Sequence, residues 1–434
     1  MMNGRRSKSA RERMVTAARQ GFLAALDIGT HKIACFIAQP EARPGDDGPT
    51  LRVIGIGHHL SRGVRSGSIV DMERAESAIR AAVEAAERMA DVTVKDIVVN
   101  VSCGQPRSDT VRVEQTVGAR EITDLDLKRL LNLARLEAER EGRSTIHATP
   151  LSYTVDGTAR IRDPRGMFGD RMGATLHAVS VQDGPLQNVE LCVERCHLGI
   201  AQRVLAPYAS GLASLVHDEM DLGVTVIDMG AGTTSIAVFF EGAMIFADVV
   251  PLGGASITND IARGLSTPVV HAERMKTLYG SALAAQGDDR EVITVPQVGE
   301  DESDSANHMP RSMLTNIIRP RLEEIFELVR DHMQHSGVEA QAGRRVVLTG
   351  GASQLTGARE LAQRVLNKQT RLGRPLRLSG LAEATGGAAF ATCAGLLSYA
   401  QMSPHEAPNE DVDRITDSQR PSWARFSQWL KENL

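Results

Sequence analysis

The sequence predicts an α/β protein with two similar lobes that face each other across a cleft. Apolar strand segments alternate with helical segments along most of the chain, which is typical of α/β folds. One short motif also occurs twice, as Leu-Asp-Ile-Gly-Thr at 26–30 and as Ile-Asp-Met-Gly-Ala-Gly-Thr-Thr at 227–234. Each copy lies in a strand–turn–strand segment, so the two halves of the chain are predicted to share one architecture.

The order of the elements follows from hydrophobic periodicity. The expected strands cover residues 22–28, 33–38, 97–101, 175–181, 224–228, 235–240 and 345–348. The expected helices cover residues 75–89, 125–139, 186–196, 311–333 (apart from Pro320) and 356–366. The acidic segment 299–307 is expected to be a solvated loop, and the polar segment 401–420 a flexible linker.

Composition excludes several classes of protein. The chain has 434 residues, of which 42% are apolar, so two or more domains with sizeable cores are expected. A net charge of -5 argues against a nucleic-acid-binding protein, although residues 1–20 form a basic arm. Five cysteines without framework spacing indicate a reduced compartment. No signal peptide is seen, and no segment reaches the ~20 apolar residues that a spanning helix needs.

The repeated turn has the chemistry of a phosphate site. Glycine lets backbone N–H groups approach phosphate oxygens, short hydroxyls add hydrogen bonds, and carboxylates hold a hydrated metal. The residues that supply these groups are Asp27, Gly29 and Thr30 in the first turn, and Asp228, Gly230, Gly232, Thr233 and Thr234 in the second. Asp27 and Asp228 are expected to flank one Mg²⁺ through its waters. The alternative is a pair of ordinary glycine hairpins, and no P-loop is present.

A third glycine turn follows a strand at Gly350 and Gly351 and precedes the helix at 356–366. Bare backbone at this position suits the approach of a flat base or sugar. Such turns are common alone, but the order of the three resembles the superfamily of actin, DnaK-like chaperones and sugar kinases. That resemblance implies ATP bound between two ribonuclease-H-like lobes. The FtsA family, which residues 272–276 resemble, implies in addition that Glu273 and Lys276 flank the adenosine.

Further segments resemble the FtsA family of bacterial division proteins. They are residues 61–71, 147–157, 163–167, 272–276 and 317–325. The resemblance runs from about residue 22 to 399 and implies two inserted subdomains, called 1C and 2B. The implied division is a basic arm (1–20), 1A (21–93 and 182–221), 1C (94–181), 2A (222–255 and 341–380), 2B (256–340), a closing helix of 1A (381–400), a linker (401–420) and a terminal amphipathic helix (421–434).

The last segment has the pattern of a membrane-surface helix. On a helix, its large apolar residues share one side, and they are Trp423, Phe426, Trp429, Leu430 and Leu434. Docking on the protein's own domain or on a protein partner is the alternative, but both tryptophans of the chain lie here, and tryptophan favours interfaces. The segment is too short to span a bilayer, so a peripheral anchor is expected.

The FtsA resemblance also implies partners and a location. It implies that 2B receives the C-terminal tail of FtsZ, that the chain self-associates into filaments, and that 1C contacts other division proteins. It places the protein on the cytoplasmic face of the inner membrane at the division site. The related adaptor PilM, the filament protein MreB and a small-molecule kinase are the alternatives, although no catalytic Asp in a sugar cleft is recognised.

The resemblance bears on hydrolysis as well. Many actin-like ATPases carry Gln or Glu at a helix start after the last strand of lobe one, where it positions the attacking water. Ala206 aligns with that position and cannot orient water, so ATP turnover is expected to be slow or negligible. For Lys32, an approach to phosphate and surface solvation both stay open.

Overall fold

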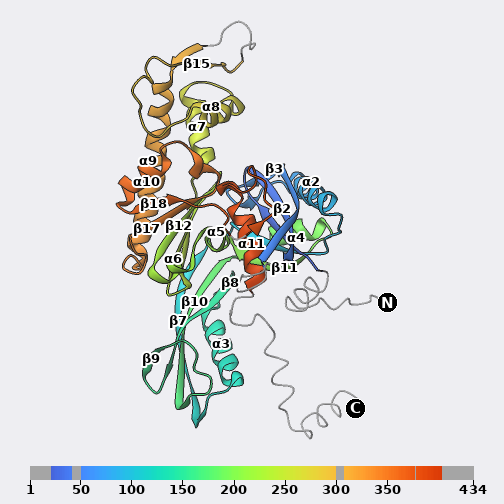
Figure 1. The fold of residues 1–434 in the computed structure, drawn as a ribbon, viewed down its shortest axis with the longest axis vertical. Helices are drawn as coiled ribbons and strands as arrows, with labels where there is room; N and C mark the ends of the chain where they lie inside the picture. The colour runs from blue at the N-terminus through green and yellow to red at the C-terminus, as the bar shows by residue number, and fades with distance from the viewer. Residues whose placement is uncertain (1–20, 42–49, 300–306, 377, 403–434) are drawn as a thin grey trace. The chain divides into compact units, whose positions relative to one another are not determined.

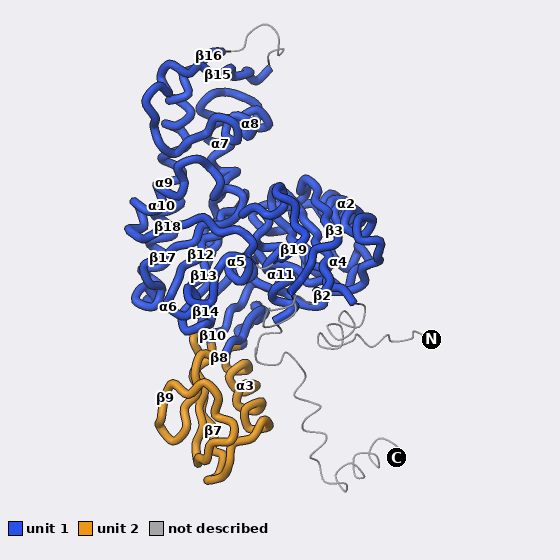
Figure 2. The backbone as a smooth tube through the Cα atoms, in the orientation of Figure 1, with its two compact units in different colours: residues 1–109, 139–149, 177–404 blue, residues 110–138, 150–176, 405–434 orange. Residues whose placement is uncertain are grey.

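The computed structural model describes residues 21–41, 50–299, 307–376 and 378–402 (Figure 1). The basic arm, most of the acidic loop 299–307, nearly all of the linker 401–420 and the amphipathic helix 421–434 lie outside them. The chain divides into two compact units (Figure 2), with residues 110–138 and 150–176 in unit 2 and the other described residues in unit 1.

The first large sheet of unit 1 has the order β11-β6-β1-β2-β3-β19. β1 pairs antiparallel with β2, and β2 with β3, whereas β1, β6 and β11 are parallel neighbours. The strands are β1 (Leu23–Ile28), β2 (Lys32–Glu41), β3 (Thr50–Leu60), β6 (Asp96–Val101), β11 (Gly199–Leu205) and β19 (Leu378–Ser379).

The second large sheet repeats this pattern in the order β14-β13-β12-β17-β18. β12, β13 and β14 are successive antiparallel neighbours, and β12, β17 and β18 are parallel neighbours. The strands are β12 (Val224–Met229), β13 (Thr234–Phe240), β14 (Ala243–Val250), β17 (Arg345–Thr349) and β18 (Gln369–Leu372). Three antiparallel strands followed by two parallel ones occur in both sheets, so the predicted pair of similar α/β lobes is confirmed.

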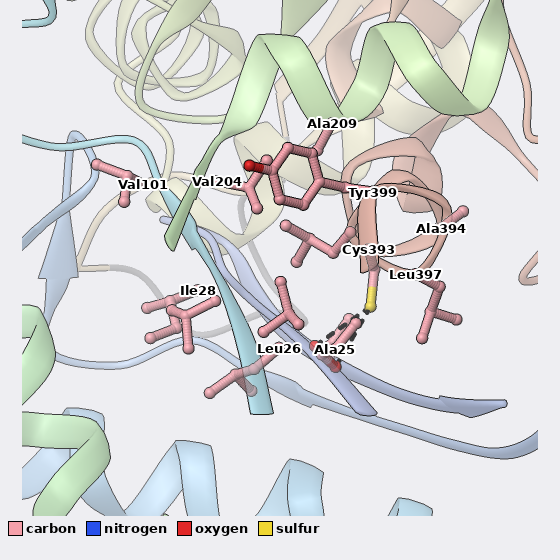
Figure 3. Close-up of a cluster of buried hydrophobic side chains, with 14 of the residues drawn as sticks. Ala25, Leu26, Ile28, Val101, Val204, Ala209, Cys393, Ala394, Leu397 and Tyr399 are labelled. Carbon is pink, nitrogen blue, oxygen red and sulfur yellow. Dashed lines mark hydrogen bonds between the residues drawn. The ribbon is translucent and has the colours of Figure 1, made fainter. Parts of the chain in front are cut away.

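Two buried helices lie at the centre of unit 1. α5 (Ala206–Ser214) packs on strands of both sheets, and α11 (Ala391–Met402) packs on α5, β1, β2 and β6. The helices cross so closely that a Cβ on Gly395 would lie 1.7 Å from the Ala209 carbonyl oxygen. Figure 3 shows the apolar side chains beneath this crossing, where the Cys393 thiol donates to the carbonyl oxygens of Ala25 and Ala34.

Helices on the outside of the first lobe fix the strands that carry the first turn. α2 (Met72–Ala90) covers β2 and β3, and α4 (Asp183–Arg195) contacts α2 and β11. The Asp71 side chain caps α2 by accepting from the Arg74 N–H. The two short strands β4 (Val64–Arg65) and β5 (Ser68–Ile69) form a hairpin whose turn reaches the first turn.

The second lobe carries an inserted helical region. It contains α7 (Gly254–Gly264), α8 (Val269–Tyr279), β15 (Val292–Val295), β16 (Asn307–Pro310) and α9 (Arg311–Ser336). α10 (Ala358–Leu366) packs on α9, and the short α6 (His217–Leu222) precedes β12. Together with the core of the second sheet, these helices form one apolar cluster, which includes Ile257, Ile318 and Phe326.

The long helix predicted at 311–333 is present as α9, which continues through Pro320. Proline inside a helix removes one hydrogen bond and costs about 3 kcal/mol. Pro320 lies on the exposed side of the helix, while buried residues at helical spacing hold the other side. These residues are Leu314, Thr315, Ile318, Leu322, Ile325, Phe326, Val329 and Met333. Their burial outweighs the local preference of proline for a break.

Unit 2 is built on a four-stranded sheet with one helix. The sheet order is β7-β10-β8-β9, and β7, β8 and β10 each continue along the chain into unit 1. The elements are β7 (Arg107–Glu121), α3 (Asp124–Ala138), β8 (Arg143–Val155), β9 (Thr158–Ile161) and β10 (Phe168–Gln182). At the start of α3, the buried Asp126 carboxylate accepts two 2.7 Å bonds from Arg120.

None of the helices in the described part of the chain is long and apolar enough to cross a membrane.

Candidate functional site

A cleft in unit 1 encloses about 1480 Å³ of empty space, its open mouth included. Its lining brings together all but one of the predicted nucleotide-site residues. They are Asp27, Gly29, Thr30, Asp228, Gly230, Gly232, Thr233, Glu273, Lys276, Gly350 and Gly351. The exception is Thr234, which is buried and donates its hydroxyl to the Leu252 carbonyl oxygen at 2.9 Å.

The first turn joins β1 to β2. The Gly29 N–H donates to the Lys32 carbonyl oxygen at 3.1 Å, and a Cβ on Gly29 would lie 2.7 Å from that oxygen. The Asn100 side chain on β6 holds the preceding strand end, because its Oδ1 accepts from the Ile28 N–H at 2.7 Å. The Thr30 hydroxyl accepts from the Gly67 N–H at 3.2 Å, so the β4–β5 hairpin supports this turn.

The second turn is closed in the same way, by a 2.9 Å bond from the Gly230 N–H to the Thr233 carbonyl oxygen. It approaches the first turn closely, because a Cβ on Gly232 would lie 2.5 Å from the Thr30 hydroxyl oxygen. The first residue of α7 contacts this turn, because the Gly254 N–H donates to the Gly230 carbonyl oxygen at 3.0 Å. The N-terminal end of α7 therefore adds its positive dipole to this side of the cleft.

The third turn lies beside the second carboxylate. Gly350 has a φ of +82°, a conformation that favours glycine, and a Cβ there would lie 2.4 Å from Asp228 Oδ1. Its N–H donates to the Ala388 carbonyl oxygen at 3.1 Å. Gly351 opens the short helix η1 (Gly351–Gln354), and a Cβ on Gly351 would meet only Ala389 Cβ, at 3.9 Å.

Two carboxylates and one ammonium dominate the electrostatics of the cleft. Burial raises the pKa of Asp27 to about 7; Lys32 lowers it and Asp228 raises it further. Burial also raises the pKa of Asp228, against hydrogen bonds from Thr392 and Ser210 and the charge of Lys32. A buried carboxylate and a half-buried one next to bare glycine backbone suit a divalent cation, which would replace the missing solvation.

Lys32 is not a solvated surface lysine. Its ammonium donates to the Ala389 carbonyl oxygen and lies 3.4 Å from the centroid of the Phe390 ring. Burial lowers its pKa, while Asp27 opposes that change. Of the two interpretations left open by the sequence, the structure favours the one with the ammonium in the cleft.

Glu273 and Lys276 form a closed polar cluster on α8. The Lys276 ammonium donates to Glu273 Oε2 at 2.7 Å, to the Thr258 hydroxyl at 2.8 Å and to the Gly254 carbonyl oxygen at 3.1 Å. Burial acts to raise the pKa of Glu273, but the bonds from Lys276 and Thr258 outweigh it and the pKa is lowered. This cluster joins α8 to the start of α7, next to the second turn.

Several residues that the sequence did not single out support the site. Asn100 had a recognisable signal, because it is a polar residue within an apolar strand, and its Nδ2 also donates to the Ser102 hydroxyl at 3.0 Å. Thr258 and Thr392 had no such sequence signal, since a threonine within a helix does not indicate which residue its hydroxyl will contact. Only the fold brings Thr392 to Asp228, at 2.9 Å across 164 positions of the chain.

Solved structures with the same architecture identify the class. The PilM protein of a PilM–PilN type IV pilus biogenesis complex matches 87% of this chain and 98% of its own, with a TM-score of 0.62 and 16% identity. MreB5 of Spiroplasma citri bound to ADP matches 88% of this chain and 97% of its own, with a TM-score of 0.52 and 12% identity. The fold is therefore that of the actin-like, two-lobed α/β proteins, as the sequence predicts.

Sequence relatives then identify the family. The family described as "Cell division protein FtsA" matches residues 225–395, and "SHS2 domain inserted in FTSA" matches residues 103–180. FtsA of Rhizobium meliloti (strain 1021) is 45% identical over 96% of both chains. FtsA of Escherichia coli (strain K12) is 32% identical over 97% of this chain and 100% of its own. The chain belongs to the FtsA family of cell division proteins.

Proposed function

We propose that the cleft binds ATP with Mg²⁺ and that the chain is an actin-like adaptor which tethers FtsZ filaments to the cytoplasmic membrane at the division site. The nucleotide part rests on one observation. Three glycine turns from separate parts of the chain line one cleft, and each lobe contributes one carboxylate, half-buried in Asp27 and buried in Asp228. The ADP-bound state of the MreB5 structure supports a nucleotide as the ligand of this fold.

Each turn has a distinct task in this proposal. The backbone and hydroxyls of Gly29, Thr30, Gly230, Gly232 and Thr233 bind the phosphates, with Thr234 holding the end of its strand. Asp27 and Asp228 hold Mg²⁺ through its waters, and the ion neutralises phosphate charge. Gly350 and Gly351 approach the sugar and base, and the Glu273–Lys276 pair flanks the adenosine.

Binding is proposed without efficient hydrolysis. Ala206 begins α5 and lines the cleft, where its methyl group offers no atom to orient a water molecule. ATP then acts mainly as a ligand that favours lobe closure and filament formation. Phosphate release from ATP by the purified chain is expected to be slow or undetectable, and turnover at an ordinary enzymatic rate of several per second would refute this part.

The tail of FtsZ is proposed to dock on subdomain 2B, within residues 256–337. This region exposes large apolar side chains, among them Val269, Val270, Leu278, Val292 and Val298. Single exposed apolar residues are ordinary, but several in one inserted region favour a docking surface. Val270→Asp is expected to weaken binding of a labelled FtsZ tail peptide at least about tenfold. Leu222→Asp is the matched control, because both side chains are 78% exposed.

Membrane attachment is proposed to depend on the amphipathic segment 421–434. Burial of its large apolar side chains contributes roughly 1.5–3 kcal/mol each before ordering costs, so one anchor binds reversibly. Filaments formed with ATP line up many anchors and strengthen attachment through avidity.

Flotation with liposomes and FtsZ polymers tests the adaptor proposal. The full chain is expected to carry FtsZ to the lipid fraction, whereas a chain without residues 423–434 is expected to bind FtsZ and stay in the soluble fraction. Equal flotation of the two chains would show that residues 423–434 are not the membrane anchor.

A further inference from the structure

The Asp228 carboxylate is held by a side chain from the other lobe. Thr392, near the start of α11, donates its hydroxyl to Asp228 Oδ2 at 2.9 Å, and both residues are 8% exposed. Asp228 belongs to β12 of the second sheet, whereas α11 packs on β1, β2 and β6 of the first. This buried hydrogen bond therefore crosses between the lobes.

The same carboxylate is fixed on its other side. The space that a Cβ on Gly350 would occupy lies 2.4 Å from Asp228 Oδ1, so the third turn packs directly against that oxygen. Ser210 on α5 acts to lower the pKa of the same carboxylate, while its hydroxyl donates to the Pro207 carbonyl oxygen at 3.3 Å. A carboxylate rotates easily about its last bond, so these contacts select one orientation from a broad range.

The segment around Thr392 contacts all three turns. The Ala388 carbonyl oxygen accepts from the Gly350 N–H at 3.1 Å, and the Ala389 carbonyl oxygen accepts from the Lys32 ammonium. Thr392 contacts the second turn through its hydrogen bond to Asp228. Within this segment, Thr392 is the residue whose side chain reaches a carboxylate, and such charge-assisted bonds are the stronger kind.

We propose that Thr392 is a positioning residue, which fixes the Asp228 carboxylate so that its free lone pairs face the cleft and thereby sets how strongly nucleotide binding depends on Mg²⁺. The inference rests on the proposed nucleotide function. Thr392 acts through Asp228, so its loss weakens the metal-dependent part of the affinity and leaves the metal-free part unchanged.

The test compares ATP affinities of the full chain by titration calorimetry in saturating Mg²⁺ and in EDTA. Thr392→Val keeps the shape and removes the donor, and it is expected to weaken binding about tenfold in Mg²⁺, with a change below about twofold in EDTA. Thr392→Ser restores the hydroxyl and is expected to restore the Mg²⁺ dependence.

Thr225→Val is the matched control. Thr225 lies on the same strand as Asp228 and is fully buried, and its hydroxyl has no hydrogen-bond partner within the described residues. This variant is expected to keep the wild-type ratio of affinities. If Thr392→Val does not fold, Thr392→Ala gives the same comparison.

Two results would overturn the inference alone: a wild-type Mg²⁺ dependence in Thr392→Val, or an equal loss with and without the metal, which indicates general damage to the fold. A wild-type chain that binds no ATP under either condition would instead overturn the proposed nucleotide function, and this inference with it.

Discussion

Gly232 of the second turn lies directly against Thr30 of the first, since a Cβ on Gly232 would be 2.5 Å from the Thr30 hydroxyl oxygen. The same Cβ would lie 2.9 Å from the backbone of Ser66. The two lobes therefore approach each other closely at the place where the proposed phosphate site lies.

Gly232→Ala tests this approach. Its methyl group has to displace the Ser66 backbone or push the turns apart, and overpacking of this kind costs about 1–3 kcal/mol. We expect the variant to bind ATP at least about tenfold more weakly and to unfold at a lower temperature. Gly387→Ala is the control, because φ there is -81° and a Cβ would meet no atom within 4 Å.

Lys276→Met tests the polar cluster on α8. Methionine keeps the length of the side chain but removes the three hydrogen bonds to Glu273, Thr258 and Gly254. A carboxylate left without its partner is costly, so the adenosine side of the cleft should rearrange and ATP affinity should fall about tenfold. The exposed Lys128→Met is the control. An ATP affinity equal to that of the wild type would show that this cluster does not contribute to nucleotide binding.

His177 predicts a pH dependence of stability. It is fully buried, and burial lowers its pKa from the ordinary 6.5 to about 4. The unfolded chain therefore takes up a proton near pH 6.5, whereas the folded chain does so only near pH 4. The stabilisation is present above pH 6.5 and is lost as pH falls through this window, by up to about 3 kcal/mol.

His177→Gln is expected to reduce that loss, because glutamine does not titrate and its amide can still form a hydrogen bond with the Ser108 hydroxyl, which lies 3.1 Å from His177 Nε2. Urea unfolding at pH 7.5 and at pH 4.5 measures the difference. The exposed His217→Gln should behave as the wild type. Identical acid sensitivity of His177→Gln and the wild type would show that other groups govern the transition.

Arg371 and Glu219 predict a large effect on stability far from the cleft. The Glu219 side chain is 4% exposed and accepts from Arg371 Nε at 2.8 Å. Arg371→Ala leaves the buried Glu219 carboxylate with the Val216 N–H and with Arg345 at 3.8 Å, so it should lower the free energy of unfolding by about 2 kcal/mol. The added change Glu219→Gln should recover part of the loss. Arg374→Ala at an exposed site should cost little, as measured by thermal unfolding.

Features encoded by neighbouring residues could be predicted from the sequence. The two carboxylate turns each lie within one hairpin, so a buried strand, Asp, Gly and Thr are visible together. The equivalence of the two sheets followed from that repetition. The long helix at 311–333 was recognised from its apolar spacing, and burial of that face carries α9 through Pro320 despite the helix-breaking preference of proline.

The supporting contacts could not be predicted, because they join distant parts of the chain. Asn100 holds Ile28 across 72 positions, and Lys32 reaches Ala389 across 357. No periodicity or motif records which donor meets which acceptor after folding. Most of the residues that line the cleft could therefore be predicted from a single sequence, while the residues that hold them in place required the fold.

The central claim is that one carboxylate from each lobe holds the metal of a bound nucleotide. ATP affinities of the wild type, Asp27→Asn and Asp228→Asn, measured by calorimetry in Mg²⁺ and in EDTA, test it most directly. We expect tighter binding in Mg²⁺ for the wild type, and loss of most of that gain in each variant with its EDTA affinity retained. Full Mg²⁺ dependence in both variants would contradict the claim.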